Sequence, residues 1–208
     1  MDMVGVKYVI AQIGDSEVLG KHNFKLVFDG GQYAVFENLT VMPRAFLASN
    51  YEGPPDVFGD EPKTEEEKLQ RERERRKLIP KKLLSEDFVF RSVIILEKPS
   101  VISAQFGPGS AEIVSLWPQE VVVKTKSAQP KILFLSDNWY PGWKATVDSD
   151  ETEILRANYT FRAVPLLAGE HEVRFYFDSS VYRLGLVISV LSLLGLGLLV
   201  FGTSKSKL

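Results

Sequence analysis

The sequence predicts a mainly β protein: an antiparallel β-sandwich, jelly-roll-like, with one charged surface helix and a C-terminal transmembrane helix. Three observations predict this fold class. Short apolar or β-branched runs recur at roughly 8–12 residue spacing with turn residues between them, as in sandwiches and barrels. Residues 61–82 are almost all Glu, Lys, Arg and Gln, and no charged residue occurs from Leu184 to Ser204.

Residues 1–60 read as a β-rich segment that packs on the sandwich or completes it. Strands are indicated at 4–10 and 44–48, and at 25–28 and 32–37 on either side of Asp29-Gly30-Gly31. Asp-Gly and Gly-Gly pairs tolerate positive φ, which two-residue hairpin turns require. The sequence therefore predicts a hairpin between residues 25 and 37.

Residues 61–82 predict a solvated helix or linker. Acidic residues occupy its first turn and basic residues its last, which complements the helix dipole. Proline lacks the backbone N–H that a helix interior needs, so Pro80 is expected to end the helix near Ile79. A second interpretation, in which Lys81 and Lys82 contact lipid headgroups, stays open.

Residues 83–180 carry β signals throughout and are assigned to the sandwich itself. Side chains alternate most clearly near its end, where His171, Val173, Phe175 and Phe177 share one face. No helices alternate with these strands, which argues against a parallel α/β sheet. The expected strands are 93–96, 111–116, 121–126, 132–135, 143–147, 152–155, 158–164 and 170–177.

Residues 183–204 predict a transmembrane helix, because roughly 20 apolar residues at about 1.5 Å each match a hydrocarbon core of about 30 Å. The alternative is a helix buried in a protein core. Lys205 and Lys207 follow the stretch and Arg183 precedes it, so the positive-inside rule makes 205–208 a cytoplasmic tail and places residues 1–183 outside. The N-terminus does not resemble a signal peptide. We therefore expect either a tail-anchored cytoplasmic protein or the end of a longer protein with upstream membrane helices.

Composition excludes several functions. The 208 residues carry a net charge of −2, so no nucleic-acid partner is expected. Without cysteine there are no disulfides, thiolate zinc sites or thiol nucleophiles. His22 and His171 are the only histidines, and HExxH, GxSxG and phosphate-loop motifs are absent from the sequence. The turn at 148–151 has oxygen ligands that Ca²⁺ accepts, but it reads chiefly as hairpin chemistry. We therefore predict no catalytic residue, no metal site and no cofactor.

The most distinctive stretch runs from Ser136 to Ala145 and places two of the three tryptophans around a Pro-Gly turn. Aromatic faces stack on sugar C–H faces, and nearby polar side chains hydrogen-bond to hydroxyls. The stretch thus suggests a glycan-binding site. In the competing interpretation, Trp143 fills the core while Trp139 and Tyr140 cover a sheet end. The candidate glycan-binding residues are Trp139, Tyr140, Trp143, Asp137, Asn138, Asn158 and Arg162.

At these residues the chain resembles a known family. Residues 137–148, 154–165 and 168–175, followed by the closing helix, resemble the C-terminal end of YfhO-like bacterial membrane proteins. Residues 6–10, 33–38 and 43–46 resemble the preceding strands. The resemblance implies a large polytopic protein similar to the C-superfamily glycosyltransferases, which use lipid-linked sugars and decorate cell-envelope polymers. Their catalytic acids lie in an N-terminal membrane half, so the resemblance assigns no catalytic residue here.

Two functional hypotheses follow. In the first, the chain is an extracytoplasmic β-sandwich domain plus the last membrane helix of a YfhO-like protein, and it binds an envelope glycan or lipid-linked sugar or braces the enzyme. The expected partners are the lipid bilayer, that sugar and upstream membrane helices. The alternative is a tail-anchored cytoplasmic scaffold whose charged helix recruits a protein partner.

Overall fold

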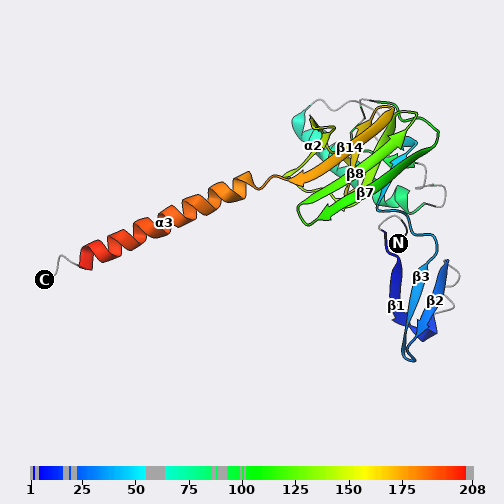
Figure 1. Cartoon of the computed structure of the whole chain (residues 1–208), viewed down its shortest axis with the longest axis horizontal. Helices are drawn as coiled ribbons and strands as arrows, with labels where there is room; N and C mark the ends of the chain where they lie inside the picture. The colour runs from blue at the N-terminus through cyan, green and yellow to red at the C-terminus, as the bar shows by residue number, and fades with distance from the viewer. Residues whose placement is uncertain are drawn as a thin grey trace.

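The computed structural model describes residues 2, 5–15, 19, 23–54, 64–85, 88, 93–98, 100 and 102–204, without the side chains of 181 and 197–204. A β-sandwich lies between a small N-terminal sheet and a projecting C-terminal helix (Figure 1). In chain order the elements are β1 (Tyr8–Gln12), η2 (Ile13–Asp15), β2 (Phe24–Asp29), β3 (Tyr33–Asn38), β4 (Ala45–Ala48), β5 (Asn50–Glu52), α2 (Glu65–Leu83), β6 (Val93–Ile95), β7 (Gly109–Trp117), β8 (Glu120–Ser127), β9 (Lys131–Asn138), β10 (Trp143–Val147), β11 (Asp150–Thr152), β12 (Leu155–Ala157), β13 (Phe161–Leu166), β14 (Gly169–Phe177) and α3 (Ser180–Ser204).

Two antiparallel sheets form the sandwich. One has the strand order β11-β10-β14-β8-β7 and the other β12-β13-β9-β4. Alternate side chains of both sheets meet in a buried core, so each strand contributes residues at a period of two. The predicted mainly β, antiparallel fold is confirmed, including the inward face of β14. The core residues are Ala45, Val121, Val123, Leu133, Leu135, Ala145, Val164, Leu166, Val173 and Phe175.

Strand β9 is buried on both faces, because a third layer covers the outer side of its sheet. Leu133 and Leu135 face the sandwich core, whereas Ile132 and Phe134 belong to a second cluster with Ile94. The third layer contains β5 and β6, which pair in parallel. They are connected through α2, a crossover that parallel pairing requires. This local parallel pair departs from the antiparallel expectation.

Helix α2 confirms the predicted charged helix, but its predicted end is wrong. Thr64 and Glu67 form a capping box at its start. Pro80 lies inside the helix, which continues to Leu83. A proline in the last turn removes only one intrahelical hydrogen bond. The turn is held by the fully buried Ile79 and by an ion pair between Lys82 and Glu52.

Two strand assignments in the second half change. The segment expected as one strand at 152–155 is divided between the ends of β11 and β12. The strand expected at 158–164 begins only at Phe161, because Asn158 and Tyr159 form a turn with φ of 44° and 78°. Such left-handed backbone ends a strand.

Besides β5 in the third layer, the first 60 residues contribute to two other places in the fold. Strands β1, β3 and β2 form their own sheet, and the hairpin predicted at Asp29-Gly30-Gly31 is confirmed between β2 and β3. In its turn, the Gly31 N–H donates to the Asp29 carboxylate at 2.8 Å. Strand β4, by contrast, pairs with β9 at the edge of the four-stranded sheet.

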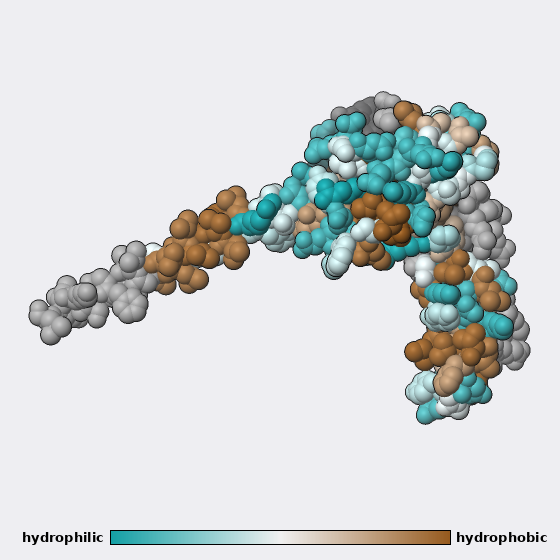
Figure 2. Space-filling model, in the orientation of Figure 1, coloured by the Kyte–Doolittle hydropathy of each residue, from teal (hydrophilic) through white to brown (hydrophobic). Residues whose placement is uncertain are grey.

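Helix α3 is apolar around its described circumference. Its large aliphatic side chains between Leu184 and Leu196 are 46–69% exposed, and Figure 2 shows this hydrophobic surface. Within the described residues, we find no helix that combines the length and the apolar character needed to cross a bilayer. The transmembrane helix predicted over 183–204 is therefore not supported.

Two sequence-based assignments lie outside the described residues. They are the tail at 205–208, with Lys205 and Lys207, and His22. The orientation inferred from the charges that flank α3 accordingly stays a prediction.

Candidate functional site

An open groove of about 680 Å³ lies at one end of the sandwich. It is bordered by the turn between β7 and β8, by the end of β9 and by the turn that leads into β10. Three aromatic side chains line it, Trp117, Tyr140 and Trp143. Five polar residues line it as well: Arg44, Ser136, Asp137, Asn138 and Arg162. The groove thus combines flat apolar surfaces with hydrogen-bonding groups.

The Pro141-Gly142 turn positions two of the three aromatic residues of the predicted motif, Tyr140 and Trp143. The Trp143 N–H donates to the Tyr140 carbonyl at 3.2 Å, which closes the turn. Gly142 has a φ of 99°, and a Cβ there would lie 2.9 Å from Cε2 of Phe177. Glycine adopts this positive φ without strain and has no Cβ to clash with the Phe177 ring. Tyr140 is consequently held in the groove with its side chain 57% exposed.

The aromatic residues differ in how much of their surface is open. The Arg162 guanidinium lies 3.6 Å from the centre of the Trp143 ring, and Phe177 contacts that ring at 5.8 Å. Trp143 is therefore a fixed wall of the groove. Trp117 is 68% exposed, and together with Tyr140 it offers the groove's accessible aromatic surface.

Arg162 enters the groove floor opposite a bulge in β9. Phe161 pairs with Asn138 but Arg162 pairs with Leu135, so Ser136 and Asp137 bulge from the ladder. The Arg162 Nε and Nη2 atoms both donate to the Asn138 carbonyl, at 3.0 and 2.8 Å. The side chain is only 4% exposed, and burial lowers the pKa of its guanidinium to about 10. The group still carries its charge at neutral pH.

Arg44 forms the opposite rim of the groove. Its Nε donates to the Asp137 carboxylate at 2.7 Å, and its carbonyl accepts from the Ser136 N–H at 2.8 Å. These two bonds hold the bulged segment of β9 against the start of β4. They also direct the Asp137 carboxylate toward Arg44.

The structure brings most of the predicted site residues together and separates two of them. Asp137, Asn138, Tyr140, Trp143 and Arg162 all line the groove. Trp139 does not line it, and its ring is covered by Arg156 at 4.1 Å. Asn158 is 1% exposed and binds the backbone of Ile95 on both sides: its Oδ1 accepts from the Ile95 N–H, and its N–H donates to the Ile95 carbonyl.

Sequence reasoning missed two of the aromatic and charged residues of the groove, Trp117 and Arg44. Trp117 could have been found from the sequence. It precedes a proline at the end of a predicted strand, and an aromatic residue at such a position is often exposed at the edge of a sandwich. Arg44 had none, since its position beside Asp137 depends on the pairing of strands far apart in the sequence.

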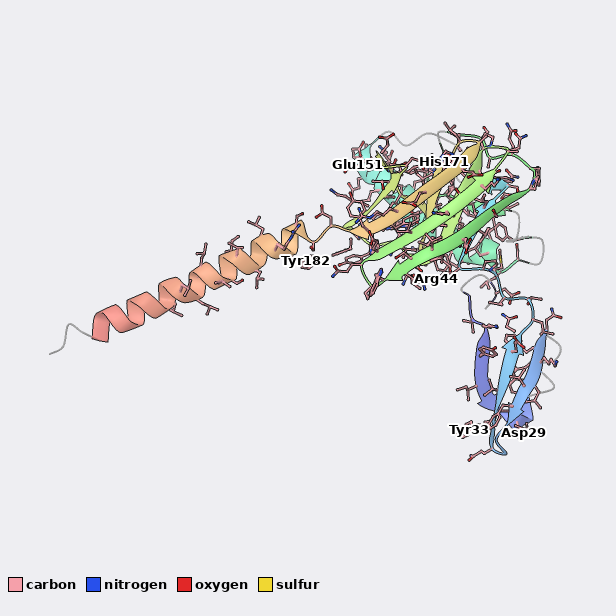
Figure 3. The ribbon with its side chains drawn as sticks, in the orientation of Figure 1. Asp29, Tyr33, Arg44, Glu151, His171 and Tyr182 are labelled. Carbon is pink, nitrogen blue, oxygen red and sulfur yellow. The ribbon has the colours of Figure 1, made fainter. Side chains whose placement is uncertain are left out.

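The groove lies at the end of the sandwich from which α3 emerges. The Asp178 N–H donates to the Gly142 carbonyl at 2.7 Å, and the Phe177 N–H donates to the Gln119 carbonyl at 3.0 Å. The Phe177 ring also contacts the ring of Tyr182, at the start of α3, at 5.9 Å. In Figure 3, Tyr182 marks this junction, whereas His171 lies toward the upper edge of the sandwich.

His171 lies in β14 and contacts the turn between β10 and β11. Its Nδ1 lies 2.6 Å from the Asp148 carboxylate, and this hydrogen bond lowers the pKa of Asp148. Asp148 and Ser149 have φ of 52° and 81°, so the turn is of the expected hairpin kind. In the part of the chain that the structure describes, no group of three or more His, Asp or Glu side chains is placed to hold a metal ion.

Comparison with protein families identifies the region that contains the groove. Residues 103–189 match the family model of the bacterial membrane protein YfhO. This stretch is a YfhO-like region. It covers β7 to β14, the start of α3 and every groove residue except Arg44. The predicted resemblance to YfhO is confirmed over these residues. Comparisons with curated proteins and with solved structures gave no match.

Proposed function

We propose that this chain provides the β-sandwich domain of a membrane-associated glycosyltransferase-like protein and that its groove binds a glycan. The YfhO-like region supports the membrane association and the glycosyltransferase likeness. The role assigned to the groove is to bind and orient a saccharide of the cell envelope or a lipid-linked sugar. No step of catalysis is assigned to its residues.

One observation carries the proposal: exposed Tyr140 and Trp117 share a groove with Asp137 and Asn138. A sugar ring has apolar C–H faces and a rim of hydroxyls, so it requires a flat aromatic surface beside hydrogen-bonding groups. The groove's volume of about 680 Å³ is within the range of small-ligand sites.

A glycan titration tests this assignment. The full chain, purified in detergent, is titrated with envelope oligosaccharides while tryptophan fluorescence is recorded. Tyr140→Ala is expected to weaken binding at least tenfold, because stacking on an aromatic ring is lost. Tyr159→Ala is the matched control, since Tyr159 is also an exposed tyrosine but lies outside the groove. Equal affinities of the two variants would contradict glycan binding in the groove, and no binding by the unaltered chain would leave only a bracing role.

We also propose that α3 holds the domain at the membrane, with the β-sandwich on the extracytoplasmic side. Its exposed aliphatic side chains favour a lipid environment, because each buried CH₂ contributes about 0.8 kcal/mol. Retention of the full chain in membranes after alkaline extraction would support membrane attachment. Loss of retention in Leu191→Arg would assign that attachment to α3. Extraction of the unaltered chain would contradict it.

The side of the membrane is tested separately with protease added to spheroplasts. Cleavage of the β-sandwich is expected if it faces outward. Protection of the sandwich in intact spheroplasts, with cleavage after lysis, would favour the cytoplasmic scaffold instead. In that alternative α2 would recruit a partner, although Ile79 and the 3.1 Å ion pair between Arg76 and Glu97 already fix α2 to the sandwich.

A further inference from the structure

Arg162 is a buried cation that forms no ion pair with an acidic side chain among the described residues, although the charge of Asp137 acts on it to raise its pKa. Its Nε and Nη2 share the Asn138 carbonyl, and Nη1 is buried with no hydrogen-bond partner among the described residues. Burying a guanidinium without an anion is costly, and an unsatisfied buried donor adds to that cost. The stacking on Trp143 offsets part of it. The unpaired Arg162 Nη1 donor is therefore suited to bind a hydrogen-bond acceptor of a ligand.

The charged groups that line the groove leave it positive. Arg44, Arg162 and Asp137 are its ionisable charged residues, and the only carboxylate among them is already bound by Arg44 Nε at 2.7 Å. The lining therefore has two cationic groups against one anionic group. A neutral sugar would leave this imbalance in place, whereas an anionic ligand would neutralise it.

We propose that the groove recognises an anionic oxygen group, a carboxylate or a phosphate, carried by the saccharide it binds. Arg162 and Arg44 are its positive partners, and Tyr140 and Trp117 contact the sugar ring. This inference rests on the proposed glycan-binding function and specifies its ligand class. Guanidinium groups bind both anions through charge-assisted hydrogen bonds, so the structure favours the shared chemistry.

The geometry also predicts which tryptophan reports binding by its fluorescence. The Arg162 guanidinium lies 3.6 Å from the centre of the Trp143 ring and its Nη1 has no hydrogen-bond partner among the described residues, so an anion held by Arg162 changes the electrostatic environment of that ring. Binding of an anionic saccharide should therefore change the fluorescence of Trp143. Trp139 lies outside the groove and should keep its environment.

The experiment compares four probes by calorimetry on the full chain in detergent: glucuronate, glucose 1-phosphate, glucose and inorganic phosphate. At least one of the two anionic sugars is expected to bind at least tenfold more tightly than glucose, and added salt should weaken its binding. Asp137→Asn should tighten anionic-sugar binding about fivefold, because it removes a like charge from the groove. A site that uses Asp137 only to hold sugar hydroxyls would instead bind more weakly.

Arginine variants separate a ligand contact from a structural role. Arg162→Met should reduce anionic-sugar affinity at least tenfold, and Arg162→Lys should retain part of it. Arg156→Met is the matched control, because Arg156 also stacks on a tryptophan but pairs with Glu97 outside the groove. If Arg162→Met fails to fold, the salt dependence of the unaltered chain and the Asp137→Asn variant decide the question.

The outcomes distinguish this inference from the function on which it rests. Glucose binding as tightly as both anionic sugars overturns the anion preference and leaves a glycan groove. If none of the sugars binds while inorganic phosphate does, the sugar-binding function fails, and so does the inference as stated. Tight binding of only one anionic sugar supports the inference and identifies whether carboxylate or phosphate is the preferred group.

Discussion

Replacement of Asn158 tests whether this residue, predicted from sequence to bind glycan, is instead a structural clamp. Its side-chain Oδ1 accepts from the Ile95 N–H at 2.7 Å and its own N–H donates to the Ile95 carbonyl at 2.8 Å. These bonds join the third layer to the turn before β13. Asn158 also has a φ of 44°, which asparagine tolerates better than most residues.

The expected loss of stability follows from these two features. Asn158→Ala leaves the fully buried Ile95 N–H without its acceptor, which costs about 1–3 kcal/mol. Alanine in left-handed backbone adds about 1–2 kcal/mol. The sum is about 2–5 kcal/mol, equivalent to a fall in Tm of roughly 4–20 °C for a chain of this size. Asn158→Gly should lose about 1 kcal/mol less, because glycine accepts the positive φ.

Urea unfolding of the full chain in detergent, followed by tryptophan fluorescence, measures both variants. Asn138→Ala is the control: this exposed asparagine binds Arg162 through its backbone carbonyl, so its variant should stay within about 0.5 kcal/mol of the unaltered chain. An Asn158→Ala variant as stable as the control would refute the clamp. So would an Asn158→Gly variant that keeps its stability but loses glycan affinity, which would restore the sequence-based assignment.

Three further changes test other parts of the fold. Gly142→Ala should destabilise by about 1–3 kcal/mol in thermal unfolding and weaken glycan binding, because its Cβ would meet the Phe177 ring; equal binding would contradict the turn's role. Phe134→Ala should cost about 3–5 kcal/mol in urea unfolding, since Phe134 is fully buried; a loss below 1 kcal/mol would contradict this packing. For Asp178, hydrogen bonds from the Ser180 N–H and from Lys144 hold the carboxyl pKa below its ordinary value of 3.8. Its stabilising effect is therefore complete above about pH 4 and is lost as the pH falls, so Asp178→Asn should be less stable at neutral pH and show a smaller loss of stability on acidification.

The features that the sequence predicted well are those that depend on neighbours in the chain. The hairpin at Asp29-Gly30-Gly31 requires only local positive φ, and the buried face of β14 follows from alternation of Val173 and Phe175. The capped charged helix was likewise readable from its end residues. Tyr140 and Trp143 belong to the same class, because a tight turn brings them into one groove whatever the rest of the sheet does.

The features that the sequence did not predict depend on pairing between distant segments. The bulge at Ser136 and Asp137 appears only when β9 pairs with β13, and it carries Arg162 under the groove. The parallel pairing of β5 with β6 depends on the crossover through α2. Trp139 and Asn158 have side-chain types common in sugar sites, but Arg156 and Ile95 occupy them. The sequence showed that Trp139 and Asn158 could contact a sugar, but their tertiary contacts with Arg156 and Ile95 make them structural residues.

The groove lies beside the junction between the β-sandwich and α3, which suits a ligand that is attached to a membrane lipid. Phe177 connects Trp143 to Tyr182 through ring contacts of 5.8 and 5.9 Å, and Lys144 pairs with Asp178 at 3.0 Å. If α3 lies in lipid as proposed, the groove opens near the headgroup layer, where a lipid-linked saccharide presents its sugar. Tyrosine and tryptophan are favoured at that depth, so Tyr140 and Trp117 suit both the sugar and the interface. A weaker glycan affinity in Phe177→Ala, with Tyr140 and Arg162 unchanged, would show that the junction with α3 helps to shape the groove.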